Sequence, residues 1–373
     1  MRWCKKCVYP ESAVNFTFNE DGVCSGCSVA AERPEIDWDA RFAHFKEICY
    51  EYQSKDKSNY DCIIPVSGGK DSYYQTYVIK EVLGLNPLLV TYNGHNYLDV
   101  GMENLNNMRD IFGCDHIFFT PSKKAIIKMN RLGFKMTGDM NWQNHAGIVT
   151  APIIAAVKYR VPLMIWGEHS LDLNGSNSLN DLVEFTARNR KENLLRGFDY
   201  EDFIEETEGL GPQDLLWCKY PSDEQIIDVG VRGIFLGNFV NWDGNKNFEV
   251  AQKYGFKPNP VPFERTYRTM SNLDDRYENG IHDLMKYVKF GYGRTTDHAS
   301  RDIRLGHLTR DQGIELVRKY DSVVSQDLYY WLEYVGMTEK EFWEIADTFR
   351  DKRVWRKENG IWVKDNIWDE AKN

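Results

Sequence analysis

Short apolar segments alternate with amphipathic segments between residues 60 and 245. The apolar segments are rich in aliphatic and β-branched residues, which is typical of buried strands. In the amphipathic segments, apolar residues recur every three or four positions, which predicts helices. The predicted strands are residues 62–66, 87–92, 116–120, 163–167 and 233–237. The predicted helices between them are residues 73–83, 101–112, 123–132 and 148–159.

This alternation predicts an α/β fold, in which helices cover both faces of a parallel sheet. Two flanking patterns differ from it. Residues 36–52 have helical spacing and precede a polar linker, and the sequence after residue 245 is mainly helical and rich in aromatic residues. Residues 182–196, within a charged insertion, also have helical propensity. The predicted organisation is a small module (1–35), a helix and linker (36–59), an α/β domain (60–245) and a mainly helical substrate-binding region (246–373).

Residues 67–72, with the sequence SGGKDS, connect the first predicted strand to the first predicted helix. Two adjacent glycines let the backbone approach a phosphate, and the start of the helix adds positive potential there. Lys70 adds a charge, and Asp71 could hold Mg²⁺, which prefers oxygen ligands. The sequence is not a Walker A loop, because Asp71 follows Lys70 where that motif has Ser or Thr. The predicted nucleotide-binding residues are Ser67, Gly68, Gly69, Lys70, Asp71 and Ser72.

This segment resembles the PP-loop, SGGxDS, of the ATP pyrophosphatases, which cleave ATP between the α and β phosphates. The alternative, an ordinary glycine turn, is disfavoured because all the motif positions match between a strand and a helix. Ligands of such sheets bind beyond the carboxyl ends of the strands. Asn93 follows the second strand, and Gly167, Glu168 and His169 follow or end the fourth. We therefore expect these residues to meet the loop at one crevice, although a single histidine at a strand end is often only a satisfied polar group.

Four cysteines near the N-terminus form two CxxC pairs, Cys4 with Cys7 and Cys24 with Cys27. Each pair places two thiolates on one turn, and two turns complete a tetrahedral shell for zinc. Asp21 and Gly22 between them predict the turn of a small hairpin. A disulfide pair is disfavoured in a reducing cytosol, and no strand–helix pattern supports a redox motif. With four thiolates the shell is closed, so the predicted zinc is structural.

Composition and charge argue against a nucleic-acid-binding, membrane or secreted protein. The formal net charge is −10 and the pI is about 5.4, whereas nucleic-acid-binding proteins usually present a basic surface. We therefore expect no nucleic-acid partner. No apolar run is long enough to span a bilayer, and the first residues lack the apolar core of a secretory signal. A cytoplasmic protein with no membrane partner is the expectation.

A second polar cluster lies in residues 289–306, KFGYGRTTDHASRDIRLG. Thr296 or Asp297 is a suitable N-cap for a short helix that ends before Gly306. On that helix Asp297, Arg301 and Arg304 fall near one face, and Arg294 lies just before it. Arginines bind phosphates bidentately, so this group could bind a diphosphate. The alternative is a surface helix with ion pairs from Asp297 to Arg301 and from His298 to Asp302.

The four cysteines, the SGGKDS loop and residues 289–306 together resemble the N-acetyl sugar amidotransferases, over essentially the whole chain. The family acts in pseudaminic acid, legionaminic acid and lipopolysaccharide O-antigen pathways. The resemblance implies a PP-loop ATP pyrophosphatase fold and the conversion of an acetamido group on a sugar, usually nucleotide-linked, into an acetamidine. Adenylation of the acetamide oxygen by ATP would give a good leaving group, which ammonia then displaces as AMP. The implied cofactors are ATP, Mg²⁺ and structural Zn²⁺.

The resemblance also suggests roles for individual residues. Lys70 and Asp71 would act on the phosphates, with His169 and His298 as candidates for proton handling. The candidate contacts to the sugar nucleotide are Arg294, Asp297, Arg301, Arg304 and Glu168. The chain has no separate glutaminase half, so ammonia is expected from partner subunits similar to the glutaminase and cyclase of imidazole glycerol phosphate synthase.

Two other functions compete with this one. A tRNA thiolase of the same superfamily can also carry paired CxxC motifs, but it typically needs further catalytic cysteines, often with an iron–sulfur cluster. Cys114 and Cys218 are single and widely separated here, and the chain is acidic. A zinc-ribbon scaffold with a vestigial nucleotide site is the non-enzymatic alternative, and the intact Lys70, Asp71 and Ser72 argue against it.

Overall fold

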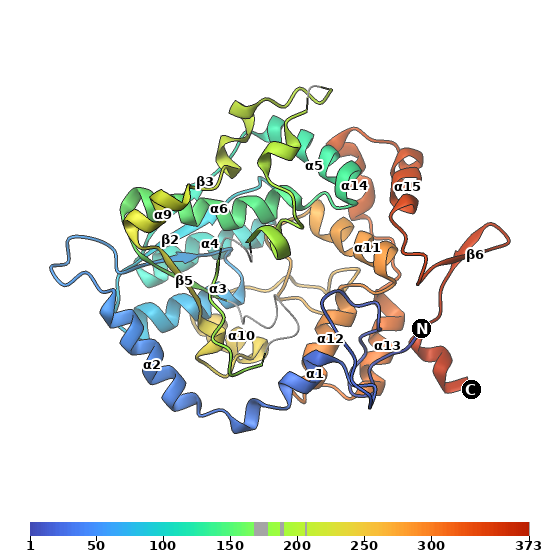
Figure 1. Cartoon of the computed structure of the whole chain (residues 1–373), viewed down its shortest axis with the longest axis horizontal. Helices are drawn as coiled ribbons and strands as arrows, with labels where there is room; N and C mark the ends of the chain where they lie inside the picture. The colour runs from blue at the N-terminus through green and yellow to red at the C-terminus, as the bar shows by residue number, and fades with distance from the viewer. Residues whose placement is uncertain (168–177, 187–189, 206, 373) are drawn as a thin grey trace.

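A five-stranded parallel sheet lies inside the molecule (Figure 1). The structure is a computed structural model that describes residues 1–167, 178–186, 190–205 and 207–372. The strands are β1 (Cys62–Pro65), β2 (Pro87–Tyr92), β3 (Asp115–Phe119), β4 (Leu163–Trp166) and β5 (Arg232–Phe235). Their order is β3-β2-β1-β4-β5, and each pairing is parallel. The predicted α/β class and parallel sheet are confirmed.

Helices cover both faces of this sheet. One face packs against α2 (Trp38–Glu51), α3 (Lys70–Tyr77), α4 (Asp99–Phe112) and α10 (Gly244–Lys253). The other packs against α6 (Trp142–Tyr159) and α9 (Asp223–Val229). In β1, Ile64 belongs to the first core and Ile63 to the second, because successive side chains of a strand point to opposite faces. Both faces are therefore apolar, which explains the continuous apolar runs in the sequence.

The C-terminal region is a helical layer beside the sheet domain. It contains α11 (Glu278–Phe290), α12 (Arg294–Arg304), α13 (Arg310–Tyr320), α14 (Asp327–Val335) and α15 (Glu339–Thr348), followed by the hairpin of β6 (Arg356–Glu358) and β7 (Ile361–Val363). Helix α5 (Lys123–Thr137) joins the two regions, because its Phe134 stacks on Phe342 at 4.9 Å and meets Trp331 edge-on at 5.4 Å. Within the described residues, no helix combines the length and apolar character needed to cross a bilayer.

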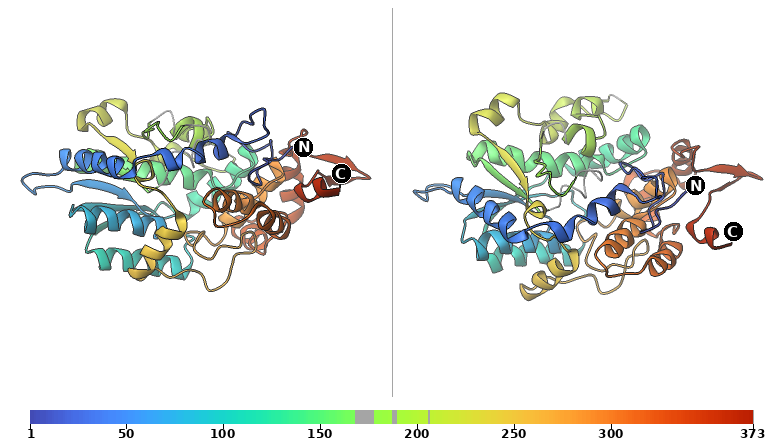
Figure 2. Two further views of the ribbon diagram at one scale, coloured as in Figure 1. Left: turned by 90° about the horizontal axis from the view of Figure 1, so that it is seen from below. Right: turned by 60° about the horizontal axis from the view of Figure 1, so that its bottom comes forward.

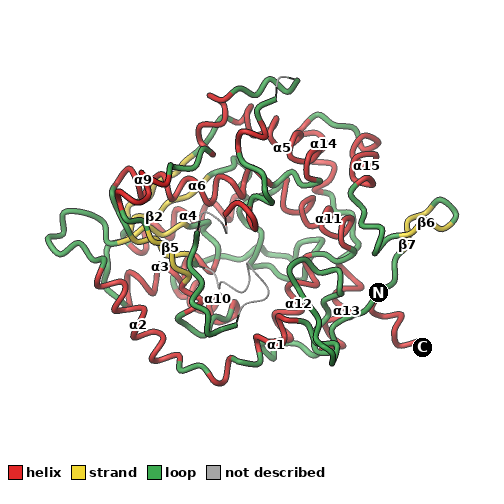
Figure 3. Tube along the Cα trace, viewed as in Figure 1, coloured by secondary structure: helices red, strands yellow, loops and turns green. Residues whose placement is uncertain are grey.

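The N-terminal module lies against the C-terminal helices, although the two are far apart in the sequence. Both views of Figure 2 show the first residues beside α12 and α13, and α2 leading back towards the sheet. Apart from α1 (Ser25–Ala30), the module is mostly loop and turn (Figure 3). The predicted turn is present, with Gly22 at φ +75°, but it closes a single bridge between Phe18 and Cys24 rather than a hairpin of two strands.

Three local predictions differ from the structure. Helix α3 ends at Tyr77 and continues as a π-helical turn over Val78–Val82. In the predicted helix 182–196, Phe185 instead pairs with Gly233 beside β5 and stacks on Trp166 at 4.8 Å, so tertiary burial outweighs helix propensity there. Helix α10, most of which was assigned to the C-terminal region, packs on α3 in the sheet domain.

Candidate active site and metal centre

The loop after β1 has the conformation of an anion-binding turn. Gly68 has φ +74°, and a Cβ there would lie 2.7 Å from Leu105 Cγ, so a larger residue would be strained in both backbone and packing. The backbone N–H of Ser67 donates to Ser72 Oγ (3.0 Å), which closes the turn. Gly69 then caps α3 without a side-chain acceptor, which leaves the start of the helix open to an anion.

Lys70 and Asp71 contact each other at the start of α3. Lys70 Nζ donates to Asp71 Oδ2 at 2.6 Å, and Asn247 Nδ2 of α10 donates to Asp71 Oδ1 at 2.8 Å. The lysine is buried while the carboxylate is about one-third exposed, with a side-chain exposure of 37%. Asp71 thus offers oxygen atoms of the type that Mg²⁺ prefers.

A cavity of about 640 Å³ opens over this loop. Gly167, at the carboxyl end of β4, also lines it. The strand order changes direction between β1 and β4, so this cavity lies where open α/β sheets usually bind ligands. Its opposite walls come from α6, α11, α12 and residues 268–275. The site is therefore shared between the sheet domain and the C-terminal region.

Three arginines and a histidine form one side of the cavity, which we call the cationic wall: Arg268, Arg294, Arg301 and His298. His298 is buried, and its Nδ1 lies 2.7 Å from Thr266 Oγ1. Burial lowers the pKa of His298 well below its usual range, and nearby cations lower it further. These cations are the three wall arginines and Lys70. Positive charge from both regions thus converges on one place, and His298 stays neutral there.

A second group of lining residues, which we call the carboxylate end, contains Asp274 and Asp275. Asp275 accepts hydrogen bonds from the backbone N–H groups of Tyr277 and Glu278, both at 2.7 Å, yet burial raises its pKa to about 7. Glu278 beneath it is fully buried and accepts from the amide side chains of Asn96, Asn130, Gln143 and Asn144. Asn144 lines the cavity and links the two carboxylates. The cavity therefore contains a group of cationic side chains and a separate group of carboxyl side chains.

Most of the residues predicted from sequence reach this cavity. Those that line it are Ser67, Gly69, Lys70, Asp71, Ser72, Gly167, Arg294, His298 and Arg301. Asn93 does not line it and instead donates to Thr120 Oγ1 at 3.3 Å. Gly68 does not line the cavity either, because it faces Leu105. Glu168 and His169 lie outside the described residues.

Two residues of α12 are placed differently from the prediction. The helix begins at Arg294 with Gly293 as its N-cap, so Thr296 and Asp297 lie inside it. Asp297 is buried and accepts from Lys286 Nζ (2.6 Å) and from the Tyr9 hydroxyl (2.8 Å). It is therefore a structural anion beneath the wall, and it does not line the cavity.

Arg304 points away from the cavity, to the cysteines. Its Nε donates to Cys27 Sγ at 3.4 Å and its Nη2 to Cys24 Sγ at 3.5 Å. The guanidinium also lies over the rings of Tyr9 (5.2 Å) and Phe16 (5.5 Å). Burial acts to lower the pKa of Arg304, but Tyr9 and the thiolates outweigh this and raise it. The prediction that Arg304 joins the phosphate-binding arginines is wrong, because one more helical turn carries it to the N-terminal module.

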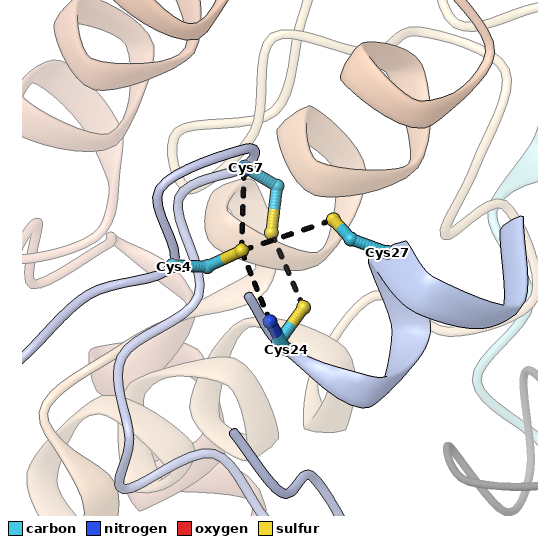
Figure 4. Close-up of side chains that lie close together, drawn as sticks. All are labelled: Cys4, Cys7, Cys24 and Cys27. Atoms are coloured by element: carbon cyan, nitrogen blue, oxygen red, sulfur yellow. Dashed lines mark hydrogen bonds between the residues drawn. The ribbon is translucent and has the colours of Figure 1, made fainter. Parts of the chain in front are cut away.

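The four cysteines form one compact, buried cluster (Figure 4). All four Sγ atoms lie within 4.8 Å of one another, with Cys4 and Cys27 at 3.9 Å and Cys7 and Cys24 at 3.6 Å. Tetrahedral thiolates 2.3 Å from one zinc ion would lie about 3.8 Å apart, so the cluster fits a single ion. In a [4Fe–4S] cluster each thiolate binds a different iron, which requires wider spacing of the four sulfur atoms. The predicted ligand set is thus brought together in a closed shell.

Sequence comparison identifies part of the chain. Residues 264–367 match the family described as "LPS biosynthesis protein WbpG-like, C-terminal domain". This part of the chain is therefore similar to the C-terminal domain of that family. This match supports the resemblance found from the sequence motifs, and it covers the segment that supplies the cationic wall and the carboxylate end. A comparison with curated proteins gave no significant match.

Solved structures that are similar to this chain share low sequence identity with it. An NH₃-dependent NAD synthetase from Campylobacter jejuni has 13% identity, covers 61% of this chain and 100% of its own, and has a TM-score of 0.29. The U34-tRNA thiolase NcsA from Methanococcus maripaludis, with its 4Fe-4S cluster, has 14% identity, 82% and 87% coverage and a TM-score of 0.31. An NMN synthetase from Francisella tularensis has 12% identity, 61% and 99% coverage and a TM-score of 0.28. With scores this low, none of them assigns a reaction to the chain.

The WbpG-like domain supplies cavity residues that sequence reasoning missed. Arg268, Asp275 and His282 are the main ones. Asn144 and His145 of α6, in a polar stretch that the sequence presents as either a rim element or a helix entry, also line the cavity. The signal for Arg268 and Asp275 was the dense polar stretch RTYRTMSNLDD, residues 265–275, inside an aromatic region. No comparable signal marked His282, whose environment depends on residues far away in the sequence.

Proposed function

We propose that this chain is an ATP-dependent, AMP-forming amidotransferase that converts the acetamido group of a nucleotide-linked sugar into an acetamidino group. The observation that carries this proposal is the shared cavity. A PP-loop-type turn lies on one side of it, and the cationic wall of a WbpG-like domain lies on the other. One enclosed space thus offers two sites for phosphate groups, which suits an adenylating enzyme whose acceptor also carries phosphate.

The residues divide between these two tasks. The loop amides and Lys70 would bind the departing pyrophosphate and stabilise its charge. Asp71 would hold Mg²⁺, which when bound would neutralise phosphate charge. Arg268, Arg294 and Arg301 would bind the diphosphate of the sugar nucleotide, because guanidinium groups bind phosphates bidentately. The acetamide would then lie between the wall and the carboxylate end.

We further propose that the cysteine cluster binds one structural zinc ion. The Sγ spacing and the closed, buried shell support zinc. Metal analysis of the purified protein tests this, with one zinc per chain and no iron as the expected result. Stripping the metal with a chelator should lower the thermal midpoint by roughly 10 °C, as expected for a loss of several kcal/mol in a chain of this size. Iron at stoichiometric amounts would contradict the assignment.

The direct test of the reaction uses ATP, Mg²⁺, ammonium and a panel of UDP- and CMP-linked acetamido sugars. The expected products are AMP, pyrophosphate and a sugar lighter by about one mass unit, because an NH group replaces an oxygen. Mass spectrometry detects that change directly. Failure to release pyrophosphate with every sugar tested would contradict the proposal.

The tRNA thiolase alternative finds less support in this site. None of the described residues that line the cavity is a cysteine, and Cys114 and Cys218 are buried in two separate cores. A thiolase would need a cysteine thiolate or an iron–sulfur cluster at the adenylated base. An iron–sulfur absorbance band in the purified protein, together with binding of tRNA, would favour the thiolase.

A further inference from the structure

A histidine–aspartate pair lies at the cavity, away from the PP-loop. His282 of α11 lines the cavity, and its Nδ1 lies 2.9 Å from Oδ1 of Asp139. Asp139 belongs to the loop between α5 and α6, and its side chain is only 3% exposed. A buried carboxylate on one ring nitrogen fixes the tautomer, so that Nδ1 carries the proton and Nε2 is the acceptor. Within the described residues, no hydrogen bond occupies Nε2.

The groups around this pair keep the carboxylate charged. Arg196 forms an ion pair with Asp139 on the side away from His282. Burial alone would raise the pKa of Asp139, but Arg196 and His282 outweigh it and lower that pKa well below its usual range. His145 of α6 lies edge-on to His282, with ring centroids 5.7 Å apart, and Lys289 donates to the carbonyl of Thr137 nearby. Asp139 is therefore a fixed anion that orients the imidazole.

The pair belongs to the carboxylate end of the cavity. Its neighbours along the lining are Asn141, Asn144, Asn279 and Asp275, whereas the arginines of the cationic wall come from α12 and residue 268. His298, the other histidine considered for proton handling, lies among four cations and is hydrogen-bonded to Thr266. These cations disfavour a positively charged imidazole, so His298 would be a poor proton acceptor. His145 directs its Nδ1 towards the carbonyl of Leu194, 3.3 Å away.

We infer that His282, oriented by Asp139, is the base that takes a proton from the attacking ammonia nitrogen. This inference rests on the proposed function. As the new C–N bond forms, the nitrogen becomes positively charged and loses one proton to Nε2 of His282. The C–O bond to the adenylate then breaks, and its electron pair leaves with AMP. The amidinium keeps the remaining N–H protons, and His282 returns its proton to solvent.

This assignment separates the two half-reactions. Adenylation needs the loop and the cationic wall but no base at the carboxylate end, whereas attack by ammonia needs His282. In His282→Gln, we expect ATP–pyrophosphate exchange with the sugar and no ammonium to stay within about threefold of wild type. Amidine formation with ammonium should fall by about 10²-fold or more, the usual contribution of a general base. Asp139→Asn should lower amidine formation by at least about tenfold for the same reason, because the tautomer is no longer fixed.

A matched control is available in the chain. His307 makes the same type of pair, with Nε2 lying 3.0 Å from Oδ2 of Asp243, but it does not line the cavity. His307→Gln should leave both half-reactions within about threefold of wild type. For a second measurement, added imidazole should restore part of the amidine formation of His282→Ala and none of that of Lys70→Ala.

The outcomes distinguish a failure of this inference from a failure of the proposed function on which it rests. If wild type releases no pyrophosphate with any sugar, the proposed function fails and this inference fails with it. If wild type makes the amidine and His282→Gln does so at a similar rate, only the role of His282 is wrong. An equal loss of exchange and of amidine formation, without rescue by imidazole, would show that His282 acts on folding or substrate binding and would also overturn the inference.

Discussion

Lys70 and Asp71 illustrate how two neighbouring side chains prepare a phosphate site. Their mutual contact keeps a buried ammonium and a partly exposed carboxylate ordered at the start of α3. Because the helix start itself attracts anions, incoming phosphates can take the place of Asp71 as the partner of Lys70. The carboxylate is then free to hold Mg²⁺.

Substitution of Lys70 tests this role. Lys70→Ala should lower AMP formation by about 10²–10³-fold, because a preorganised charge is lost where the leaving group becomes more negative. Steady-state measurement of AMP and pyrophosphate checks the loss. Lys340→Ala is the control, since that lysine is exposed and forms an ion pair with Glu344 at 3.8 Å. More than a tenth of wild-type activity in Lys70→Ala would rule out the proposed role.

Asp275 leads to a prediction about pH. Its pKa of about 7 lies above that of an unfolded aspartate, so the native state holds a proton that the unfolded state loses between about pH 4 and 7. Native stability therefore decreases as pH rises through this window. Asp275→Asn removes the effect, and the variant should gain about 1–3 kcal/mol relative to wild type between pH 5 and 8. Urea unfolding of both proteins at the two pH values measures it, and an unchanged difference would contradict the pKa.

Helix α12 connects the metal centre to the cavity. His298 and Arg301 face the cavity, Asp297 binds Lys286 and Tyr9, and Arg304 reaches the thiolates. A Cβ on Gly26 of α1 would lie 2.5 Å from Arg304 Nη2, so the guanidinium packs closely on the module. The N-terminal module is therefore expected to set the position of the wall, although it lies outside the cavity.

Arg304→Gln tests this connection. The variant keeps all four thiolates and should retain its metal, but the KM for the sugar nucleotide should rise about five- to tenfold while the KM for ATP stays unchanged. The reason is that α12 loses its contact with the module and the arginines are held less firmly. Arg310→Gln is the matched control, because Arg310 contacts the carbonyls of Cys4 and Cys7 from α13 rather than α12. Equal effects of the two substitutions would show a general loss of stability instead.

At the scale of the whole molecule, the eight cysteines bear on the source of the nitrogen. All eight cysteines are buried, and four of them form the metal cluster. A glutaminase that uses a cysteine nucleophile needs an accessible thiolate. In the proposed reaction, ammonia would then come from solution or from a partner.

The corresponding experiment compares nitrogen sources. The purified chain should form the amidine with ammonium and show less than a hundredth of that rate with glutamine. Adding glutaminase and cyclase-like partner subunits should make glutamine an efficient donor. Equal rates with glutamine and ammonium for the chain alone would contradict a supply from partners.

Much of the fold was predictable because its signals are local. Buried parallel strands need continuous apolar residues, and the predicted strands match β1–β5 to within two residues at each end. The predicted helix 182–196 is wrong around Phe185, because the pairing of that residue beside β5 depends on a partner about fifty positions away, whereas Arg190–Leu194 is helical. Helix propensity carries no information about such a partner.

The sequence by itself determined the chemical groups of this protein: a phosphate-binding loop, a four-cysteine ligand set and an arginine-bearing helix. These follow from spacing over a few residues, where chain geometry leaves little freedom. Only the tertiary structure decided which groups meet. It places Arg304 at the cysteines and Arg268 in the cationic wall. It also places Asp139 beside His282, although the two residues are more than a hundred positions apart in the sequence. Such contacts arise from the packing of segments that are far apart in the sequence, as where α5 meets α11, α14 and α15 in one core, and no short stretch of sequence encodes them.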